Sequence, residues 1–114
     1  GICLGHQAIV EFFDGNLENL QNVKHGVSSE NQIIENDSIF QGIPKEFQIA
    51  HYHSWVAEKD SLPNCLLLTS ENKDGLIMSV SHKKYDVKGI QFHPESFATE
   101  GGKELIKNFL LTMH

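Results

Sequence analysis

The chain has 114 residues, of which 39% are hydrophobic and 21% are charged, enough for one domain with a hydrophobic core and too few for two. Fifteen acidic residues against nine basic ones give a formal net charge of -6, which argues against nucleic acid or an anionic membrane as the main partner. Because the longest apolar run covers only residues 65–68, we expect no membrane span. The two cysteines, Cys3 and Cys65, have neither CxxC nor disulfide-framework spacing. This usage is typical of a reducing compartment, so we expect a cytoplasmic protein.

The first predicted element is a tight turn that leads into a helix. Residues 1–5 read Gly-Ile-Cys-Leu-Gly, and the apolar residues of the following segment, 6–13, fall mostly on one side of a helix. Asp14 and Gly15 are expected to end this helix, because glycine readily adopts the left-handed conformation found just past a helix end.

The middle of the chain is predicted to consist mainly of strands. Alternating or continuous apolar residues predict strands over 31–34, 47–52, 55–57, 65–69, 76–80 and 87–92. The mixed pattern over 16–27 indicates strand and loop, and 39–43 indicates a short helical turn. The dipeptide Asp74-Gly75 is a turn signal that predicts a hairpin between the strands on either side. The continuous apolar run 65–68 is typical of a strand that is covered on both faces.

The last predicted element is a helix over residues 102–111. Leu105, Ile106, Phe109 and Leu110 recur there at helical spacing. Strands between a first and a last helix predict an α/β fold, an open mixed sheet with flanking helices and an antiparallel portion in its middle. No repeat or linker divides the sequence, so we expect one domain.

Residues 1–5 have the form of a nucleophile elbow, a sharp turn between a strand and a helix with Cys3 at its apex. We expect a strained backbone at Cys3, and glycine at positions 1 and 5 because side chains there would collide. The turn would set the sulfur near the amino end of the helix. The dipole there favours the thiolate, so we expect a pKa below the free value of about 8.5. The alternative is a small buried cysteine in a glycine-rich turn. Cys65, inside an apolar run, is expected in the core.

His93-Pro94-Glu95 follows the last predicted strand and contains the base that a cysteine nucleophile needs. Proline disfavours the helical conformation at His93, and residues two apart in an extended chain face the same way. Glu95 can therefore orient the imidazole of His93 and stabilise its charged form. The alternative is a loop in which both side chains are simply solvated. Together with Cys3, the segment makes up a candidate Cys-His-Glu triad.

Two further histidines, His51 and His53, share one face of a predicted strand and raise the question of a metal site. No third ligand has a recognisable spacing to them, so we expect a structural or substrate-lining role, no metal and no cofactor. The histidines without a partner pattern are expected at the surface: His25, His82 and His114.

Three segments together resemble the signatures of the class I (triad-type) glutamine amidotransferases. They are 1–7 (Gly-Ile-Cys-Leu-Gly-His-Gln), 51–55 (His-Tyr-His-Ser-Trp) and 91–96 (Gln-Phe-His-Pro-Glu-Ser), and their order and separation match the family. An Asn-Phe-Leu segment at 108–110 extends the resemblance to nearly the whole chain. Within the family, the sequence is most similar to the glutaminase components of anthranilate synthase and of aminodeoxychorismate synthase.

The resemblance implies a flavodoxin-like fold and a glutaminase reaction without a cofactor. Cys3 would attack the side-chain amide carbon of L-glutamine. His93, oriented by Glu95, would protonate the departing ammonia and then activate water to release glutamate. The ammonia would pass to a chorismate-binding synthase subunit (component I) as the partner. The sequence does not decide between the anthranilate and the 4-aminobenzoate branch.

By the same resemblance, Gln7 is expected to contact the glutamine substrate from one helical turn past Cys3. Ser54 and Trp55 are expected to meet the α-amino and carboxylate end of the substrate, largely through backbone groups. The backbone N–H of Leu4 is expected to form part of the oxyanion hole. Trp55 departs from relatives, in which leucine is common at this position, but a backbone contact would survive the change.

In the resembling family, further strands precede the elbow, together with a loop that supplies a second oxyanion donor. We therefore expect residues 1–114 to be the C-terminal portion of a single amidotransferase domain, and the chain alone to have little or no activity. The first alternative is the glutaminase domain of another amidotransferase, serving GMP or carbamoyl phosphate synthesis. The second is a non-catalytic remnant that only binds a synthase subunit. The third is a cysteine hydrolase of related fold, which does not account for Gln7 and the segment 52–54.

Overall fold

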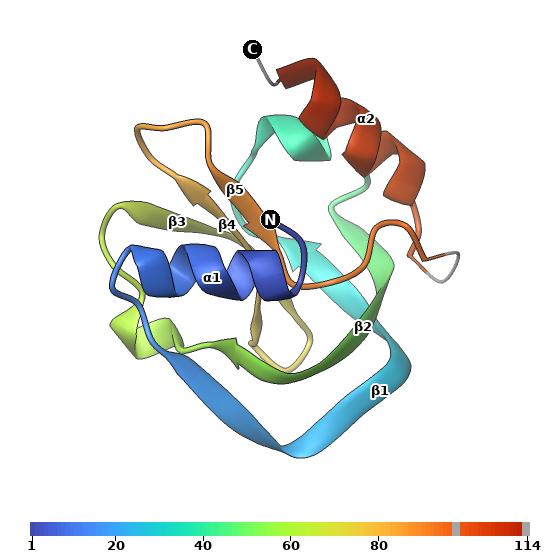
Figure 1. Ribbon diagram of the computed structural model, residues 1–114. Helices are drawn as coiled ribbons and strands as arrows, with labels where there is room; N and C mark the ends of the chain where they lie inside the picture. Colours follow the sequence, from blue (N-terminus) through green and yellow to red (C-terminus); the bar gives the residue numbers. More distant parts are fainter. Residues whose placement is uncertain (97–98, 113–114) are drawn as a thin grey trace.

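The computed structural model describes residues 1–96 and 99–112, with the side chains of all of these except 20–29, 51–54 and 112. Figure 1 shows the arrangement of its helices and strands. In chain order they are α1 (Leu4–Phe12), β1 (Leu17–Ile33), the 3-10 helix η1 (Ser38–Phe40), β2 (Glu46–Ala57), the 3-10 helix η2 (Lys59–Ser61), β3 (Leu66–Asn72), β4 (Ile77–His82), β5 (Lys88–Ile90) and α2 (Gly102–Thr112). None of the described helices is long and apolar enough to cross a membrane.

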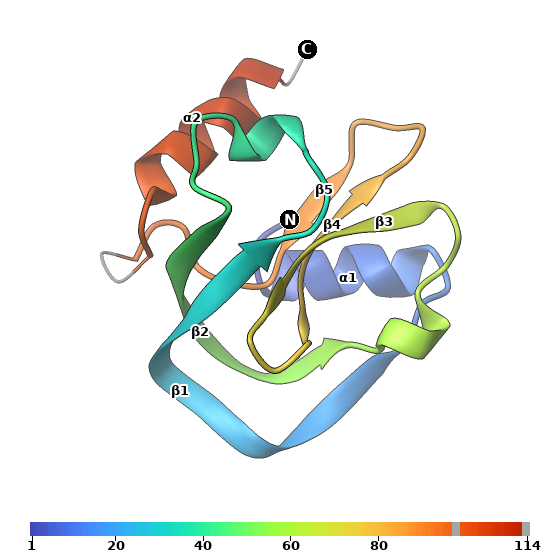
Figure 2. The ribbon, with the colours of Figure 1, turned by 180° about the vertical axis from the view of Figure 1, so that it is seen from behind.

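The strands form one curled sheet in the order β2-β1-β3-β4-β5. Neighbouring strands in this order are antiparallel, and a parallel bridge joins Ile2 to Ile90 in the edge strand β5. α1 lies across the sheet, in front of it in Figure 1 and behind it in Figure 2, while α2 packs against η1. The predicted α/β fold with flanking helices and an antiparallel middle is confirmed.

The predicted hairpin between β3 and β4 is also confirmed. Gly75 has a φ of 80°, a value that glycine adopts without strain. The side-chain oxygen of Asn72 accepts hydrogen bonds from the N–H groups of Asp74 at 3.0 Å and Leu76 at 2.9 Å. The turn is therefore closed by a side chain as well as by glycine.

The end of α1 differs in detail from the prediction. Asp14, with a φ of 71°, takes the left-handed conformation that was expected of glycine. Gly15 is needed for a different reason, because a Cβ there would lie 2.7 Å from the Val10 side chain. The N–H of Gly15 donates to the Val10 carbonyl at 2.8 Å, so the chain leaves the helix in close contact with its last turn.

The segment predicted as strand and loop, 16–27, belongs to the single long strand β1. Likewise, the two strands predicted over 47–52 and 55–57 are one strand, β2. The register between β1 and β2 shifts between Asn19 and Lys24 and again between Lys24 and Val27. Each irregularity resets which residues face inward, so a continuous strand has no continuous alternation in its sequence.

Two hydrophobic clusters fill the interior. The first packs with α2 and η1 and consists of Ile33, Ile39, Phe40, Phe47, Ile49, Met78, Ile90, Phe92 and Leu105. The second packs with α1 and consists of Val10, Ala57, Leu66, Ile77 and Val80. Cys65 is half-buried against the second cluster. The run 65–68 is only partly covered, because Leu66 alone among its residues is buried.

Candidate active site

Cys3 lies at the turn between Ile2 and α1. Its φ of 52° and ψ of -101° are unfavourable for a residue with a side chain, by about 1–3 kcal/mol. Two main-chain hydrogen bonds tie the turn to β5: the N–H of Cys3 donates to the Ile90 carbonyl at 2.7 Å, and the N–H of Ile90 donates to the Gly1 carbonyl at 2.9 Å. The expected strained turn is present, and β5 holds it in place.

The two glycines of the elbow meet different surroundings. A Cβ at Gly1 would lie 2.5 Å from the carbonyl carbon of Gly5 and 2.8 Å from the backbone nitrogen of His6, so a side chain there would collide with main chain. In the described part of the chain, nothing lies within 4 Å of a Cβ at Gly5. The expected collision is confirmed for Gly1 and wrong for Gly5, because the first turn of α1 directs position 5 into open space.

The pKa of the Cys3 thiol is raised above its usual value, so the expectation of a lowered pKa is wrong. Burial is the largest cause. The N–H of Leu4, which hydrogen-bonds the sulfur, lowers the pKa, and the negative charge of Glu95 raises it further. The helix terminus therefore does not outweigh burial. The thiol is protonated at neutral pH, and a reaction at this sulfur needs a base that takes the proton.

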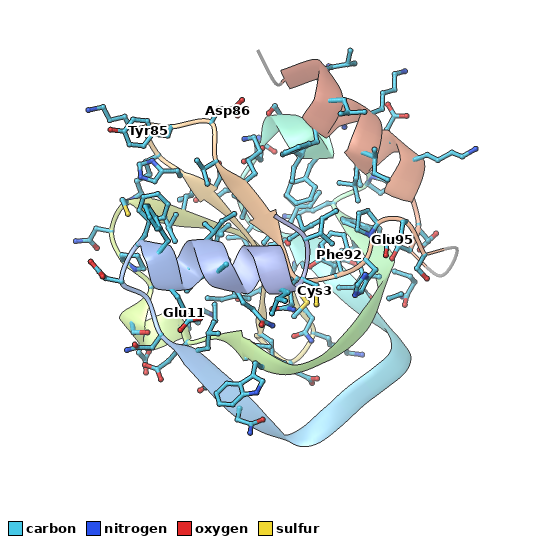
Figure 3. All side chains as sticks on the ribbon, in the orientation of Figure 1. Cys3, Glu11, Tyr85, Asp86, Phe92 and Glu95 are labelled. Atoms are coloured by element: carbon cyan, nitrogen blue, oxygen red, sulfur yellow. The ribbon has the colours of Figure 1, made fainter. Side chains whose placement is uncertain are left out.

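His93 and Glu95 lie on the segment that follows β5. The extended conformation expected across 93–95 is wrong, because Pro94 and Glu95 lie in a turn in which the Ser96 N–H donates to the His93 carbonyl at 3.3 Å. The Nδ1 atom of His93 lies 2.8 Å from the carboxylate Oε2 of Glu95, and because a carboxylate can only accept, Nδ1 carries the proton and Nε2 of the neutral ring has the lone pair. The side chains are 24% and 60% exposed, respectively. Figure 3 shows Glu95 near the end of α1 that carries Cys3, in keeping with its effect on the thiol.

The main chain at His93 is held by β2 and by Thr99. The N–H of His93 donates to the Ala50 carbonyl at 2.9 Å. The hydroxyl of Thr99 donates to the His93 carbonyl at 2.6 Å and accepts from the Ala50 N–H at 2.9 Å. The preceding Phe92 is fully buried and packs edge-on against Phe47, with ring centroids 5.9 Å apart. These contacts fix His93 relative to the sheet.

Gln7, expected at the substrate, is buried and hydrogen-bonded to protein groups. Its Nε2 donates to the Trp55 carbonyl at 2.9 Å and to the Oε1 of Gln91 at 3.3 Å. The Nε2 of Gln91 in turn donates to the Sγ of Cys3 at 3.7 Å. The structure therefore connects Gln7 to the sulfur through Gln91.

Sequence reasoning assigned no role to Gln91 or Thr99. A signal was available for Gln91, because positions 91, 93 and 95 alternate and would share one side of an extended segment. The hydrogen bonds of Thr99 to β2 and to His93 arise from tertiary structure, so no spacing in the sequence reveals this role.

An open groove of about 670 Å³ runs beside the elbow, between α1 and the end of β2. Its lining residues are Leu4, Gln7, Ala8, Glu11, Asn16, Leu17, Trp55 and Glu58. The residues Leu4 and Trp55 are 76% and 46% exposed. The structure brings Leu4, Gln7 and Trp55 together at this groove, while the side chain of Ser54 lies outside the described residues.

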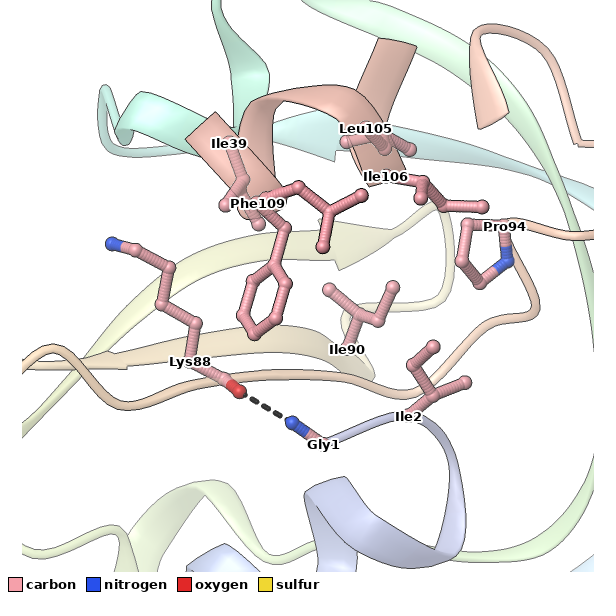
Figure 4. Close-up of a pocket in the computed structure, with 10 residues that line it drawn as sticks. Gly1, Ile2, Ile39, Lys88, Ile90, Pro94, Leu105, Ile106 and Phe109 are labelled. Atoms are coloured by element: carbon pink, nitrogen blue, oxygen red, sulfur yellow. Dashed lines mark hydrogen bonds between the residues drawn. The ribbon is translucent and has the colours of Figure 1, made fainter. Parts of the chain in front are cut away.

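A second cavity, of about 350 Å³, lies between the start of the chain, β5 and α2 (Figure 4). Its walls are mostly apolar and include Ile2, Ile90, Pro94 and Phe109. Cys3, His93 and Glu95 line neither this cavity nor the groove. We relate the groove to the candidate active site because Leu4, which follows Cys3, lines it together with Gln7 and Trp55.

Among the residues whose side chains are described, no three His, Cys, Asp or Glu are grouped as metal ligands would be. His82, expected at the surface, is half-buried, and its Nδ1 accepts hydrogen bonds from two backbone N–H groups in the following turn. The side chains of four other histidines lie outside the described residues: His25, His51, His53 and His114.

Comparison with known proteins relates these features to a family. The model of the family "Glutamine amidotransferase class-I" matches residues 1–113. The chain is 39% identical, over 114 residues, to the aminodeoxychorismate/anthranilate synthase component 2 of Bacillus subtilis, covering 98% of this chain and 57% of the relative. It is 40% identical, over 111 residues, to the aminodeoxychorismate synthase component 2 of Escherichia coli, covering 96% and 58%. The chain therefore spans somewhat more than half the length of these curated relatives.

Solved structures show the same fold. A candidate GMP synthase protein from Thermoplasma acidophilum superimposes with a TM-score of 0.88 at 25% identity, over 96% of this chain and 54% of that one. A glutamine amidotransferase from Thermotoga maritima superimposes with a TM-score of 0.72 at 18% identity, over 97% of this chain and 44% of that one.

Proposed function

Because the chain belongs to the class-I glutamine amidotransferase family, we propose that it carries the glutaminase site of a synthase that transfers ammonia to chorismate. The product is anthranilate or 4-amino-4-deoxychorismate, in line with the names of the relatives from Bacillus subtilis and Escherichia coli. One observation carries the proposal. The edge strand β5 anchors the strained Cys3 through Ile90, and the segment that leaves this strand carries the hydrogen-bonded pair of His93 and Glu95.

In the first half of the reaction, Nε2 of His93 takes the proton of the Cys3 thiol. The sulfur attacks the side-chain amide carbon of glutamine, and the carbonyl oxygen of that amide becomes negative. The imidazolium of His93 then gives its proton to the amide nitrogen, the carbon–nitrogen bond breaks, and ammonia leaves a glutamyl thioester on Cys3. Glu95 stabilises the imidazolium while it carries the proton.

In the second half, a water molecule gives a proton to His93 and attacks the thioester carbon. The carbon–sulfur bond breaks, glutamate leaves, and His93 returns the proton to the Cys3 sulfur. The raised pKa of Cys3 suits this sequence, because the thiol keeps its proton until the base removes it. No cofactor is required in either half.

The substrate lies in the groove between α1 and the end of β2. The N–H of Leu4, which hydrogen-bonds the Cys3 sulfur, is next to the reacting atom and serves as an oxyanion donor. The α-amino and carboxylate end of glutamine lies next to Gln7, Ser54 and Trp55. The Nε2 of Gln7 already donates to the Trp55 carbonyl. Gln7 therefore shapes the wall of the groove rather than donating this hydrogen bond to the substrate.

The partner is a chorismate-binding synthase subunit, which receives the ammonia. A glutaminase for GMP synthesis is the second candidate, favoured by the TM-score of 0.88 to the Thermoplasma acidophilum protein. The higher identity to chorismate-related components, 39–40% against 25%, favours the first.

The test measures glutamate release from glutamine by the complete polypeptide encoded with this chain, with and without a chorismate-binding synthase subunit. Cys3→Ala is expected to lower turnover by about 10³-fold or more. Cys65→Ala is the matched control, since Cys65 packs against the second hydrophobic cluster, and it is expected to keep most of the activity.

Covalent labelling by 6-diazo-5-oxo-norleucine, a glutamine-like electrophile, provides the second measurement. Labelling at Cys3 but not at Cys65 supports an assembled glutaminase site. Absent labelling, or equal labelling of both cysteines, contradicts the proposal and favours a non-catalytic remnant. Ammonia transfer to XMP by a GMP synthase partner, without transfer to chorismate, favours the second candidate.

A further inference from the structure

Gln91 occupies a buried position directly against the sulfur of Cys3. It follows β5, and its backbone N–H donates to the Met78 carbonyl at 2.7 Å. The residue has no exposed surface. Its side chain reaches from the sheet to α1, where the Nε2 atom lies 3.7 Å from Cys3 Sγ and the Oε1 atom 3.3 Å from the Nε2 of Gln7.

A backbone carbonyl fixes the orientation of both amides. The Trp55 carbonyl can only accept, so the atom of Gln7 that faces it at 2.9 Å is the NH2 nitrogen. The same nitrogen faces Gln91, whose oxygen must therefore point toward Gln7. The NH2 group of Gln91 is left to face Cys3, so the sulfur meets a donor and not an acceptor.

We propose that Gln91 is a further catalytic residue, whose N–H group stabilises the Cys3 thiolate when His93 takes the proton, and that Gln7 is the positioning residue that orients it. The inference deepens the proposed function and rests on Cys3 being the nucleophile. A thiolate accepts hydrogen bonds far better than a thiol does, so the donor favours the ionised form.

The surroundings of the sulfur make such a donor necessary. Among the described residues, Glu95 carries the charge that acts on the Cys3 sulfur, and this negative charge opposes ionisation, as does burial. From α1, the Leu4 N–H is directed at the sulfur, while the side chain of His6 lies against Gly89. Gln91 is a neutral group, so it assists the thiolate at every pH without changing the charge of the site.

The test measures the pH dependence of Cys3 alkylation by iodoacetamide in the complete polypeptide, with Cys65→Ala as the parent. Gln91→Met keeps the size of the side chain and removes the hydrogen-bond donor. We expect the midpoint of the pH dependence of the alkylation rate to rise by about one pKa unit. Below the midpoint, alkylation then slows by about ten-fold. Gln91→Glu places a negative charge beside the sulfur and is expected to raise the midpoint further.

The matched control is Gln32→Met, because Gln32 is exposed on β1; it is expected to leave the midpoint unchanged. Gln7→Met removes the orienting contact to Gln91 together with the hydrogen bond to the Trp55 carbonyl, but leaves the donor of Gln91 in place, and is expected to give a smaller rise of this midpoint than Gln91→Met. A midpoint of Gln91→Met equal to that of the parent, with an unchanged melting temperature, overturns the inference.

If Gln91→Met does not fold, NMR of the unsubstituted protein tests whether the Gln91 amide contacts the ionising sulfur. The side-chain amide resonance of Gln91 is expected to shift with the ionisation of Cys3, whereas that of Gln32 stays constant; a constant Gln91 resonance overturns the inference.

Turnover separates this inference from the proposed function. We expect Gln91→Met to lower kcat and leave KM unchanged, since the amide contacts the sulfur rather than the substrate. An active parent whose Gln91 variants keep their thiol midpoint overturns only the role of Gln91. An inactive parent whose midpoints shift as expected overturns only the glutaminase proposal.

Discussion

Cys3 and His93 are held in different ways, although both are attached to the same short strand, β5. On the nucleophile side, residues 1–5, main-chain hydrogen bonds to Ile90 hold the turn, and Gly1 leaves no room for a side chain. On the base side, residues 93–96 and 99, the side chains of Glu95 and Thr99 hold His93 in addition to its main-chain hydrogen bond to Ala50. Substitutions on the nucleophile side should therefore act through steric collision, and those on the base side through lost hydrogen bonds.

The largest effect is expected from Gly1→Ala. The added Cβ would meet the carbonyl carbon of Gly5 at 2.5 Å, and main chain in a first helical turn cannot move aside without breaking the contact to β5. We expect a loss of about 3 kcal/mol in the free energy of unfolding, measured by urea denaturation, together with loss of selective labelling at Cys3.

Gly5→Ala is the control on the same side of the site. Its Cβ meets nothing within 4 Å in the described part of the chain, and alanine favours the helix over glycine by about 0.5–1 kcal/mol. We expect unchanged or slightly increased stability. Equal destabilisation by the two substitutions would refute the steric account of the elbow.

An intermediate effect is expected on the base side from Thr99→Val. Valine keeps the shape but removes the hydroxyl that bonds both the Ala50 N–H and the His93 carbonyl. The His93 carbonyl keeps the Ser96 N–H as a donor at 3.3 Å, but the buried Ala50 N–H loses its acceptor, which destabilises by about 2 kcal/mol; the melting temperature reports this loss. Thr99→Ser retains the hydroxyl and should recover most of the loss; if serine behaves like valine, packing rather than hydrogen bonding holds His93.

The smallest effect on stability is expected from Glu95→Gln, because the side chain of Glu95 is 60% exposed. Glutaminase turnover should nevertheless fall by about ten-fold or more, since the imidazolium of His93 loses its charged partner. The pKa of Cys3 should fall as well, because the Glu95 charge raises it, so alkylation of Cys3 should begin at lower pH. Glu104→Gln, on the exposed first turn of α2, is the control. If the pKa of the Cys3 thiol rises in Glu95→Gln, the conclusion that the Glu95 charge raises this pKa is wrong.

Periodicity in the sequence was sufficient for elements whose side chains alternate or repeat without interruption. The two helices and the β3–β4 hairpin were predicted near their true bounds for this reason. The long strand β1 was predicted only in pieces, as strand and loop over 16–27 and as a strand over 31–34. Its pairing with β2 shifts twice, between Asn19 and Val27, and such shifts interrupt the alternation from which a continuous strand is predicted. Register against a partner strand is a tertiary property that one strand's sequence does not contain.

The candidate site was predictable where local geometry dictates residue type. Gly1 follows from the tight turn at Cys3. The pairing of His93 with Glu95 was expected from an extended segment, whereas the structure brings the two side chains together across a turn. The pKa of Cys3 was not predictable, because burial depends on how α1 packs and overrides the helix terminus. The contact of Gln7 with the Trp55 carbonyl depends on how α1 packs against β2, and no spacing in the sequence specifies it.

The pairing of the elbow with β5 also determines when the site can exist during folding. The hydrogen bond between Gln91 and Cys3 joins residues 88 positions apart, and closing so long a loop is entropically unfavourable until other contacts bring the ends together. A growing chain that still lacks β5 contains Cys3 but neither its strained turn nor its base. Cys3, the proposed nucleophile, thus acquires its strained turn and its proposed base only after β5 has joined the sheet, so a partly synthesised molecule contains this thiol without either of them.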